Sequence, residues 1–246
     1  MKGLARSILN VVPPEVIVHD EEEACQYLPG RRARQPLRVP LRELTPAEFD
    51  QRLEAGDRRA GQLLYTQACA ACAACEPIRV DVRTFVPSRS QRRVQAKAHA
   101  IVETRLGPPE VDERRIALYL EHLDKRGLAR DGETLDARGY ASFFLASCVE
   151  GFEIRYFIGG QMVGLALTDQ GERSFSAMYT YWDPAYEALS LGTYSILTQI
   201  ALARKTGLDW VYLGLAIKDC APMSYKTRFL PHERRIGGVW RRFERG

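Results

Sequence analysis

Apolar residues recur at helical spacing through much of the chain before residue 150. The helices predicted from this spacing cover residues 46–56, 90–106, 111–125 and 135–145. Thr45 and Glu48 form a capping box at the start of the first helix, and Ser90 is expected to cap the second. Residues 79–85 instead alternate apolar and polar side chains, which predicts a strand between these two helices.

The pattern becomes strand-like after residue 150. Apolar runs predict strands over residues 152–158, 161–168, 174–182 and 210–217. Gly159 and Gly160 separate the first two runs, which predicts a hairpin with a two-residue turn. A helix is expected over residues 191–205, and Gly207 is its predicted stop.

Gly107-Pro108-Pro109 breaks the chain between these two patterns. We therefore expect an N-terminal cysteine-bearing domain over residues 1–107 and a second domain over residues 108–246. The second domain has helices followed by a hairpin, a strand, a helix and a strand, an order typical of acetyltransferase-like (GNAT) domains. The predicted fold class is α+β, with a mixed sheet and helices.

In such a domain, the helix before the last of these strands holds a phosphate-bearing donor at its amino end. Coenzyme A users usually carry an Arg/Gln-x-x-Gly-x-Gly/Ala turn at that point. The corresponding turn here, residues 188–193, contains one glycine and no basic residue. We therefore expect that coenzyme A is not bound.

The composition is that of an ordinary globular protein. Of the 246 residues, 46% are hydrophobic and 27% are charged, and no apolar run approaches the length of a membrane-spanning helix. The first ten residues lack the apolar core and the cleavage site of a signal peptide. Six cysteines without such a signal are more typical of reduced thiols than of disulfides, so we expect a cytoplasmic protein that does not associate with a membrane.

Basic residues are clustered, although the net charge of +4 is small. Residues 79–97 contain six basic side chains and one acidic side chain, a local balance of +5. Further basic clusters lie in residues 31–38 and 234–245. Such clusters often form solvated surfaces, but their position beside the cysteines favours a polyanionic ligand such as a nucleic-acid backbone.

Cys69, Cys72 and Cys75 follow one another at intervals of three residues. Together with Cys25 they offer four thiolates, which suit a tetrahedral zinc ion or an iron–sulfur cluster. A redox-active pair and inert packing of small apolar side chains are the alternatives. Cys220 follows the last predicted strand, and we expect it to be unrelated to this group.

Short blocks of sequence spread over most of the chain carry a family resemblance. The early blocks are Cys25-x-Tyr27-Leu28-Pro29, the cysteine triplet with Pro77-Ile78-Arg79-Val80, and Phe85-x-Pro87-Ser88-Arg89-Ser90-Gln91-Arg92-Arg93. The later blocks are Ser176-Ala177-Met178-Tyr179-Thr180, Asp183-Pro184, Ser190-Leu191-Gly192-Thr193-Tyr194, Val211-Tyr212-Leu213-Gly214 and Met223-Ser224-Tyr225-Lys226. In this order they resemble the bacterial aminoacyl-tRNA–protein transferases, the aspartate/glutamate leucyltransferases related to eukaryotic arginyl-tRNA–protein transferase.

The resemblance implies an enzyme that transfers an aminoacyl group from aminoacyl-tRNA to the amino terminus of a protein beginning with Asp or Glu. The product would be a degradation signal of the N-end rule pathway. Bacterial relatives typically use leucyl-tRNA, whereas eukaryotic relatives use arginyl-tRNA and have cysteines linked to an iron–sulfur cluster or zinc. Leu215-Ala216 replaces the Tyr-Trp often found in the family, which bears on the choice of donor. We expect a monomer.

This reaction needs no covalent nucleophile, because an aminoacyl ester is already activated. The acceptor amine, with a pKa of about 8, has only to be neutral, so positioning, a proton acceptor and stabilisation of the oxyanion are expected to carry catalysis. The candidate catalytic residues, all in matched blocks, are Tyr179, Tyr194, Tyr225 and Lys226. The candidate acceptor-binding cations are Lys226, Arg228 and Arg89. The candidate tRNA-binding residues are Arg89, Arg92, Arg93, Ser190 and Thr193.

Each of these candidates also has an interpretation without a catalytic or binding role. The tyrosines are compatible with core positions, and the cations are compatible with a solvated surface. Two other functions also remain open: a coenzyme A-dependent N-acyltransferase on the same fold, and a metal-bearing nucleic-acid-binding protein without catalysis. The second of these leaves the hairpin-and-helix half of the chain without a role, which counts against it.

Overall fold

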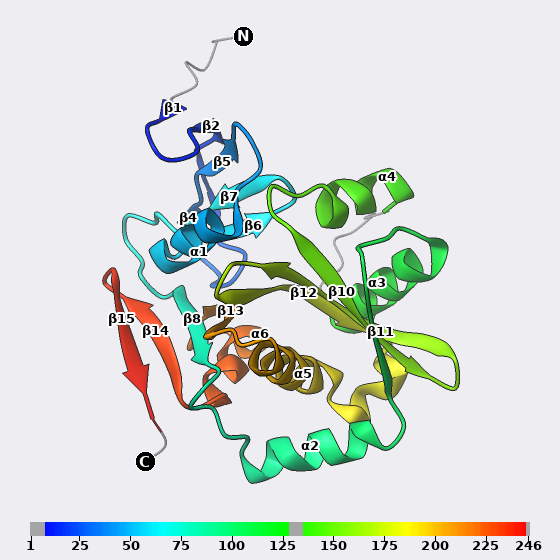
Figure 1. Cartoon of the computed structure of the whole chain (residues 1–246). Coiled ribbons are helices and arrows are strands. Elements are labelled where there is room, and N and C mark those ends of the chain that lie inside the picture. The colour runs from blue at the N-terminus through cyan, green and yellow to red at the C-terminus, as the bar shows by residue number, and fades with distance from the viewer. Residues whose placement is uncertain (1–7, 128–134, 245–246) are drawn as a thin grey trace.

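A five-stranded sheet and a hairpin form the N-terminal part of the computed structural model, which describes residues 8–127 and 135–244 (Figure 1). The sheet has the strand order β1-β2-β5-β7-β6. Its strands are β1 (Ile8–Leu9), β2 (Glu15–His19), β5 (Leu37–Pro40), β6 (Arg58–Ala60) and β7 (Leu63–Tyr65). The hairpin consists of β3 (Glu22–Ala24) and β4 (Arg32–Arg34).

An eight-stranded mixed sheet occupies the centre of the molecule, with the order β15-β14-β8-β13-β12-β11-β10-β9 (Figure 1). Its strands are β8 (Glu76–Asp81), β9 (Glu103–Gly107), β10 (Gly151–Ile158), β11 (Gln161–Gln170), β12 (Ser174–Trp182), β13 (Trp210–Ala216), β14 (His232–Ile236) and β15 (Val239–Phe243). Strands β12 and β13 run parallel, and the other neighbours are antiparallel. The predicted α+β class with a mixed sheet is confirmed.

Helices cover both faces of this sheet. The α-helices are α1 (Pro46–Ala55), α2 (Arg89–His99), α3 (Glu113–Lys125), α4 (Ala137–Tyr140), α5 (Leu191–Lys205) and α6 (Ala221–Ser224), and shorter helical segments are η1 (Ala141–Leu145), η2 (Pro184–Leu189) and η3 (Tyr225–Arg228). On one face, Leu118 of α3 packs in a cluster with Leu165 and Leu167 of β11. On the other face, Leu191 of α5 packs with Ala166, because successive side chains of a strand point to opposite sides.

The sequence pattern predicts the first helix and the hairpin correctly. The Thr45 hydroxyl accepts a hydrogen bond from the Glu48 N–H at 3.3 Å, and the Glu48 carboxylate accepts one from the Thr45 N–H at 2.8 Å. Gly159 and Gly160, in the turn between β10 and β11, both have positive φ values of 57° and 82°. The predicted capping box and hairpin turn are therefore confirmed.

The predicted helix over residues 90–106 is wrong at both ends. The N-cap is Ser88, whose hydroxyl accepts from the Gln91 N–H at 3.2 Å, while the Gln91 side chain accepts from the Ser88 N–H at 2.7 Å. The helix ends at His99, and residues 103–107 instead form β9, which pairs with the edge of β10. Tertiary pairing overrides the helical spacing of the apolar residues in this segment.

The strand predicted over residues 79–85 begins three residues earlier and ends four residues earlier, as β8. It ends at Asp81, whose carboxylate accepts a hydrogen bond from the Arg83 N–H at 3.0 Å and so begins a turn. Within the sheet, Val80 pairs with Val211 of β13 on one side and with His232 of β14 on the other. β8, which belongs to the segment before the expected domain boundary, thus lies inside the sheet with a paired strand on each side.

The eight-stranded sheet contains elements of both predicted domains. Strand β8 precedes the Gly-Pro-Pro breaker, β9 ends at its glycine, and β10 to β15 follow it. The sheet therefore crosses the boundary expected at residue 107. In the part of the chain that the structure describes, no helix is long and apolar enough to cross a bilayer.

Candidate active site

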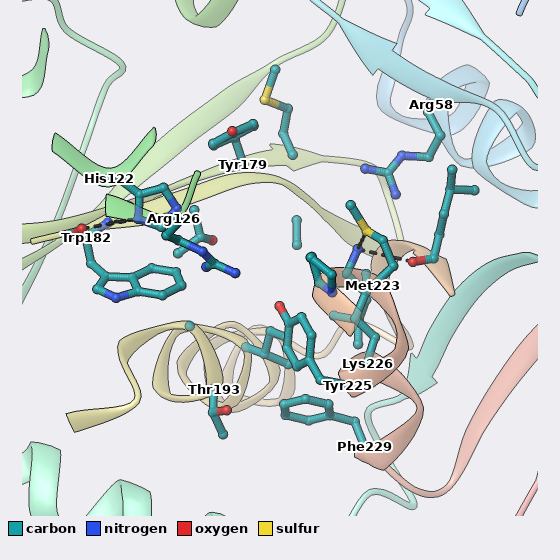
Figure 2. Close-up of a pocket in the computed structure, with 18 of the residues that line it drawn as sticks. Arg58, His122, Arg126, Tyr179, Trp182, Thr193, Met223, Tyr225, Lys226 and Phe229 are labelled. Carbon is teal, nitrogen blue, oxygen red and sulfur yellow. Dashed lines mark hydrogen bonds between the residues drawn. The ribbon is translucent and has the colours of Figure 1, made fainter. Parts of the chain in front are cut away.

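A cavity of about 840 Å³ opens between the N-terminal sheet and the start of α5. Its walls come from β6, β12, β13, the first turns of α2 and α5, and the segment from α6 to η3. Figure 2 shows Arg58 and Arg126 entering the cavity from opposite sides, with Tyr179 across from Tyr225. The volume is that of a typical small-molecule site, large enough for a nucleoside carrying an amino acid.

The amino end of α5 forms one wall. Ser190, directly before the helix, adopts a left-handed conformation with a φ of 53° and makes no capping hydrogen bond with its side chain. Gly192 lies against Trp182, since a Cβ at this glycine would come within 2.9 Å of the indole ring. Together with Thr193, these residues line the cavity, where an uncapped helix start favours an anionic group.

The charge of the cavity is predominantly positive. Its lining cations are Arg58, Arg59, Arg126, Lys226 and Arg228, against the single carboxylate of Glu187 among the described lining residues. Arg59 is neutralised by Asp169, with Nη2–Oδ1 and Nε–Oδ2 distances of 2.6 and 2.9 Å. Burial and the nearby Arg126 lower the pKa of His122 to about 4, so its imidazole is neutral at pH 7. The remaining cations give the cavity an affinity for anions.

Lys226 is half-buried in the wall formed by η3. Its Nζ donates to the Leu215 carbonyl and contacts the Met223 sulfur, each at 3.2 Å. Burial, together with the positive charge of Arg58, lowers the pKa of Lys226 to about 7, and Cys220 opposes this shift. A substantial fraction of Lys226 is therefore neutral at physiological pH and able to accept a proton.

Two of the three candidate tyrosines line the cavity. Tyr179 packs edge-on against Phe144, and burial raises the pKa of Tyr225, an effect that Arg126 opposes. Tyr194 is only 1% exposed and packs against Tyr156 in the core, where its hydroxyl lies 3.2 Å from His99 Nδ1. The structure brings Tyr179, Tyr225 and Lys226 to one cavity and places Tyr194 outside it.

The candidate arginines divide between the cavity and the surface. Arg228 lines the cavity and is exposed, and the Gln91 side chain donates to its carbonyl at 3.3 Å, which ties α2 to η3. Arg89, Arg92 and Arg93 are exposed on α2 and do not line the cavity. They form a basic surface on the helix whose first turn reaches the cavity rim.

The four candidate metal ligands gather around the loop after β7. The backbone N–H groups of Leu28 and Arg34 donate to the sulfur atoms of Cys25 and Cys69, each at 3.4 Å. Burial, and then the neighbouring cysteines, raise the pKa of Cys75 to about 12. Among the described residues, no group of three or more His, Cys, Asp or Glu side chains is arranged to hold a metal ion.

Cys220 belongs to this cluster, contrary to expectation. It packs with Cys25, Cys72 and Cys75 around Leu215 and Ile217. Leu215 lies near the end of β13, and Ile217 directly follows the strand. The chain leaves β13 beside the cysteine loop because β8, which follows that loop directly, pairs antiparallel with β13. Local spacing carries no information about this pairing.

Sequence reasoning missed Arg58, Arg126 and Trp182, which all line the cavity. Arg58 lies on a three-residue strand with no apolar alternation, and Arg126 follows the last residue of α3. The guanidinium of Arg126 stacks over Trp182 at 5.0 Å from the ring centroid. No local signal marks these residues, because their proximity depends on contacts between distant elements.

Two family matches cover most of the chain. Residues 23–93 match the family described as arginine-tRNA-protein transferase, N terminus, and residues 114–236 match arginine-tRNA-protein transferase, C terminus. The cavity draws its walls from both matched segments.

Curated relatives match over nearly their whole length. The chain is 37% identical to an aspartate/glutamate leucyltransferase of Thiobacillus denitrificans over 224 residues, which is 89% of this chain and 91% of the relative. It is 35% identical to the enzyme of the same name from Marinobacter nauticus, over 98% of each chain.

Among solved structures, the C-terminal domain of a putative lysylphosphatidylglycerol synthetase from Agrobacterium fabrum has a similar fold. The match has a TM-score of 0.50 and 11% identity, and it covers 82% of this chain and 64% of that one. The likeness is one of fold alone. With two family matches and relatives at 35–37% identity, the chain belongs to the arginine-tRNA-protein transferase family.

Proposed function

We propose that this protein transfers an aminoacyl group from aminoacyl-tRNA to the α-amine of a protein that begins with Asp or Glu. Leucine is the proposed donor residue, because the relatives at 35–37% identity are named aspartate/glutamate leucyltransferases. The observation that carries the proposal is the electropositive cavity with aromatic walls, which adjoins a helix start and contains a lysine with a lowered pKa. The product would be a degradation signal.

The chemistry requires a neutral amine, a proton acceptor and a group that stabilises the oxyanion. The acceptor amine attacks the ester carbonyl, a C–N bond forms, and the ester C–O bond breaks to release the tRNA hydroxyl. Lys226 is suited to take the proton that the amine loses and to return it to the departing tRNA oxygen, since its pKa is about 7. Tyr225 is suited to donate a hydrogen bond to the oxyanion, because burial keeps its hydroxyl protonated.

The tRNA is proposed to approach over α2. Arg89, Arg92 and Arg93 are exposed there and are available for phosphate contacts. The terminal adenosine would then enter between Tyr179 and Tyr225, beside Ser190 and Thr193 at the start of α5. Lys226 and Arg228 would lie on the acceptor side, while Arg89, outside the cavity, fits a tRNA contact better than an acceptor contact.

The proposed reaction can be tested directly. Protein incubated with leucyl-tRNA is expected to modify peptides that begin with Asp or Glu about a hundredfold faster than matched peptides that begin with Asn or Gln. Arginyl-tRNA and acetyl-coenzyme A serve as the competing donors, and product mass identifies the group added. Acetylation from coenzyme A without transfer from either tRNA would contradict the proposal.

We also propose the finer fold assignment, an acetyltransferase-like (GNAT) core preceded by a cysteine-bearing N-terminal domain. Three features support it: the antiparallel run from β10 to β12, the α5 crossover to a parallel β13, and an uncapped α5 start facing the cavity. A monomer in the cytoplasm is part of the same proposal.

A metal-binding role is proposed for Cys25, Cys69, Cys72 and Cys75. Their thiols are soft ligands suited to zinc or to an iron–sulfur cluster, and backbone N–H groups already point at two of the sulfur atoms. Burial, and then repulsion from the neighbouring cysteines, raises the pKa of Cys75, and a bound cation would counter both effects. When bound, the metal would fix the loop between β7 and β8.

Replacing Cys72 with Ser is therefore expected to abolish the metal content of protein purified without oxygen and to lower its melting temperature. Zinc, iron and acid-labile sulfide are measured together. Cys148→Ala is the matched control, because Cys148 is buried in a different cluster and should leave the metal content unchanged. Freshly isolated protein with neither zinc nor iron would contradict the metal site.

A further inference from the structure

Arg58 is a cation inside the cavity that the structure leaves without a partner. Its Nε and Nη1 atoms are buried and make no hydrogen bond. Within the described residues, none of the ion pairs includes Arg58. Buried guanidinium nitrogens without a hydrogen-bond partner are costly, because they have lost their water and no protein group replaces it.

Three of the other cations of the cavity have a partner in the structure, and the fourth, Arg228, is exposed to solvent. Arg59, next to Arg58 on β6, is paired with Asp169, and Arg126 stacks over Trp182. Lys226 donates to the Leu215 carbonyl. Arg58 therefore stands out as the cation best placed to receive an anionic ligand.

Gly214 provides the room in which the Arg58 side chain lies. This glycine has a φ of 89°, and a Cβ at that position would come within 2.0 Å of Arg58 Nη1. Any other residue at position 214 would displace the Arg58 guanidinium. The strand thus admits the arginine into the wall, and Figure 2 shows its guanidinium directed toward the cavity.

We propose that Arg58 binds the side-chain carboxylate of the acceptor's first residue and so selects Asp and Glu. This inference rests on the proposed function and deepens it. Arg58 and Lys226 line the same side of the cavity in Figure 2, so an acceptor residue can present its carboxylate to Arg58 and its α-amine to Lys226. A guanidinium binds a carboxylate through two parallel hydrogen bonds and stays charged at any physiological pH.

A carboxylate fits this place better than a tRNA phosphate does. Arg58 belongs to the N-terminal sheet, whereas the exposed arginines suited to phosphates lie on α2. Figure 2 shows Arg58 on the side of the cavity near Met223 and Lys226, away from Thr193 at the start of α5. The acceptor and the donor would thus approach from different sides.

The test compares peptides that begin with Asp and Asn in the unmodified enzyme and in Arg58→Gln. We expect the Asp-to-Asn ratio of kcat/KM to fall from about a hundredfold to about one, through loss of Asp modification and not through gain of Asn modification. The KM for leucyl-tRNA should not change. Arg105→Gln is the matched control, since it removes one exposed arginine far along the sheet edge and should keep the ratio.

The Asp-to-Asn ratio of kcat/KM also distinguishes failure of this inference from failure of the proposed function. Equal losses for both peptides, or a raised KM for tRNA, would show a structural or phosphate-binding role and overturn the inference. Absence of transfer by the unmodified enzyme would instead contradict the proposed function itself.

Because a glutamine at this buried site can reduce folding, Arg58→Lys provides a second variant. It keeps the charge but loses the bidentate contact, so the ratio should fall about tenfold, and an unchanged ratio would contradict the proposal.

Discussion

Replacing Lys226 with methionine is expected to lower kcat for aminoacyl transfer by about a hundredfold or more. The substitution preserves the length of the side chain but removes the amine whose pKa lies at about 7. The charged groups that act on this amine are Arg58 and Cys220. Loss of the proton acceptor should leave the KM for leucyl-tRNA unchanged, since the proposed phosphate contacts of the tRNA lie on α2.

The pH dependence gives the decisive readout. Below pH 7, both the acceptor amine, with a pKa of about 8, and Lys226 must lose a proton, so log kcat/KM should rise with a slope of 2. In Lys226→Met only the acceptor amine titrates, and the slope should be 1. The exposed Lys218 provides the control variant Lys218→Met, which should keep a slope of 2. A slope of 1 in the unmodified enzyme would exclude Lys226 as the proton acceptor.

Loss of folding should not explain the Lys226→Met result. The pKa of Lys226 is lower in the folded protein than in the unfolded chain, so the unfolded chain binds more protons between about pH 7 and pH 10.5. The lysine therefore lowers the free energy of unfolding in this range, and the penalty is fully present below pH 7. Methionine removes it, so the variant should be at least as stable at pH 7.

Replacing Asp169 with alanine is expected to lower the free energy of unfolding by about 3–5 kcal/mol. Asp169 on β11 and Arg59 on β6 are 2% and 3% exposed, so the substitution leaves a buried guanidinium without its anion. Arg59 Nη1 also donates to the Gly61 carbonyl at 3.0 Å. The pair joins the N-terminal sheet to the central sheet, and denaturant unfolding measures its loss.

Two further variants test the physical reason. Glu103→Ala removes an ion pair with Arg105 of similar geometry, 2.6 Å between Nε and Oε1, but both side chains are more than half exposed. We expect Glu103→Ala to lower the free energy of unfolding by less than about 1 kcal/mol. The double variant Arg59→Met with Asp169→Leu should recover much of the lost stability, because neither charge then remains buried. A small effect of Asp169→Ala would show that Arg59 reaches water when its partner is removed.

Local signals predicted the elements whose ends are set by their own residues. The capping box at Thr45, the turn at Gly159 and Gly160, and α5 with its stop at Gly207 are examples. The segment over residues 103–107 was mispredicted because its conformation depends on the free edge of β10. Helical spacing and strand pairing compete there, and only the tertiary structure decides between them.

The residues of the candidate site likewise divide into those that local sequence identifies and those that only the tertiary structure reveals. Tyr179, Tyr225 and Lys226 were found through their sequence blocks, and they meet in one cavity. Arg58 was missed because its importance arises from the space beside Gly214, a residue far away in the sequence. Tyr194 belongs to a matched block but lies in the core, where it supports α5. A sequence block identifies a neighbourhood and does not separate lining residues from supporting ones.

The position of β8 also affects how the protein is made. This strand is synthesised early, yet its two neighbours in the sheet, β13 and β14, are completed only at residues 216 and 236. At about 5–20 residues per second, the ribosome needs roughly 7–30 s to add the intervening residues. During that time Ile78 and Val80, both fully buried in the finished protein, have no sheet to join. β8 can therefore complete its pairing only after the C-terminal strands emerge, and long-range pairing of this kind slows folding and leaves apolar residues open to aggregation until then.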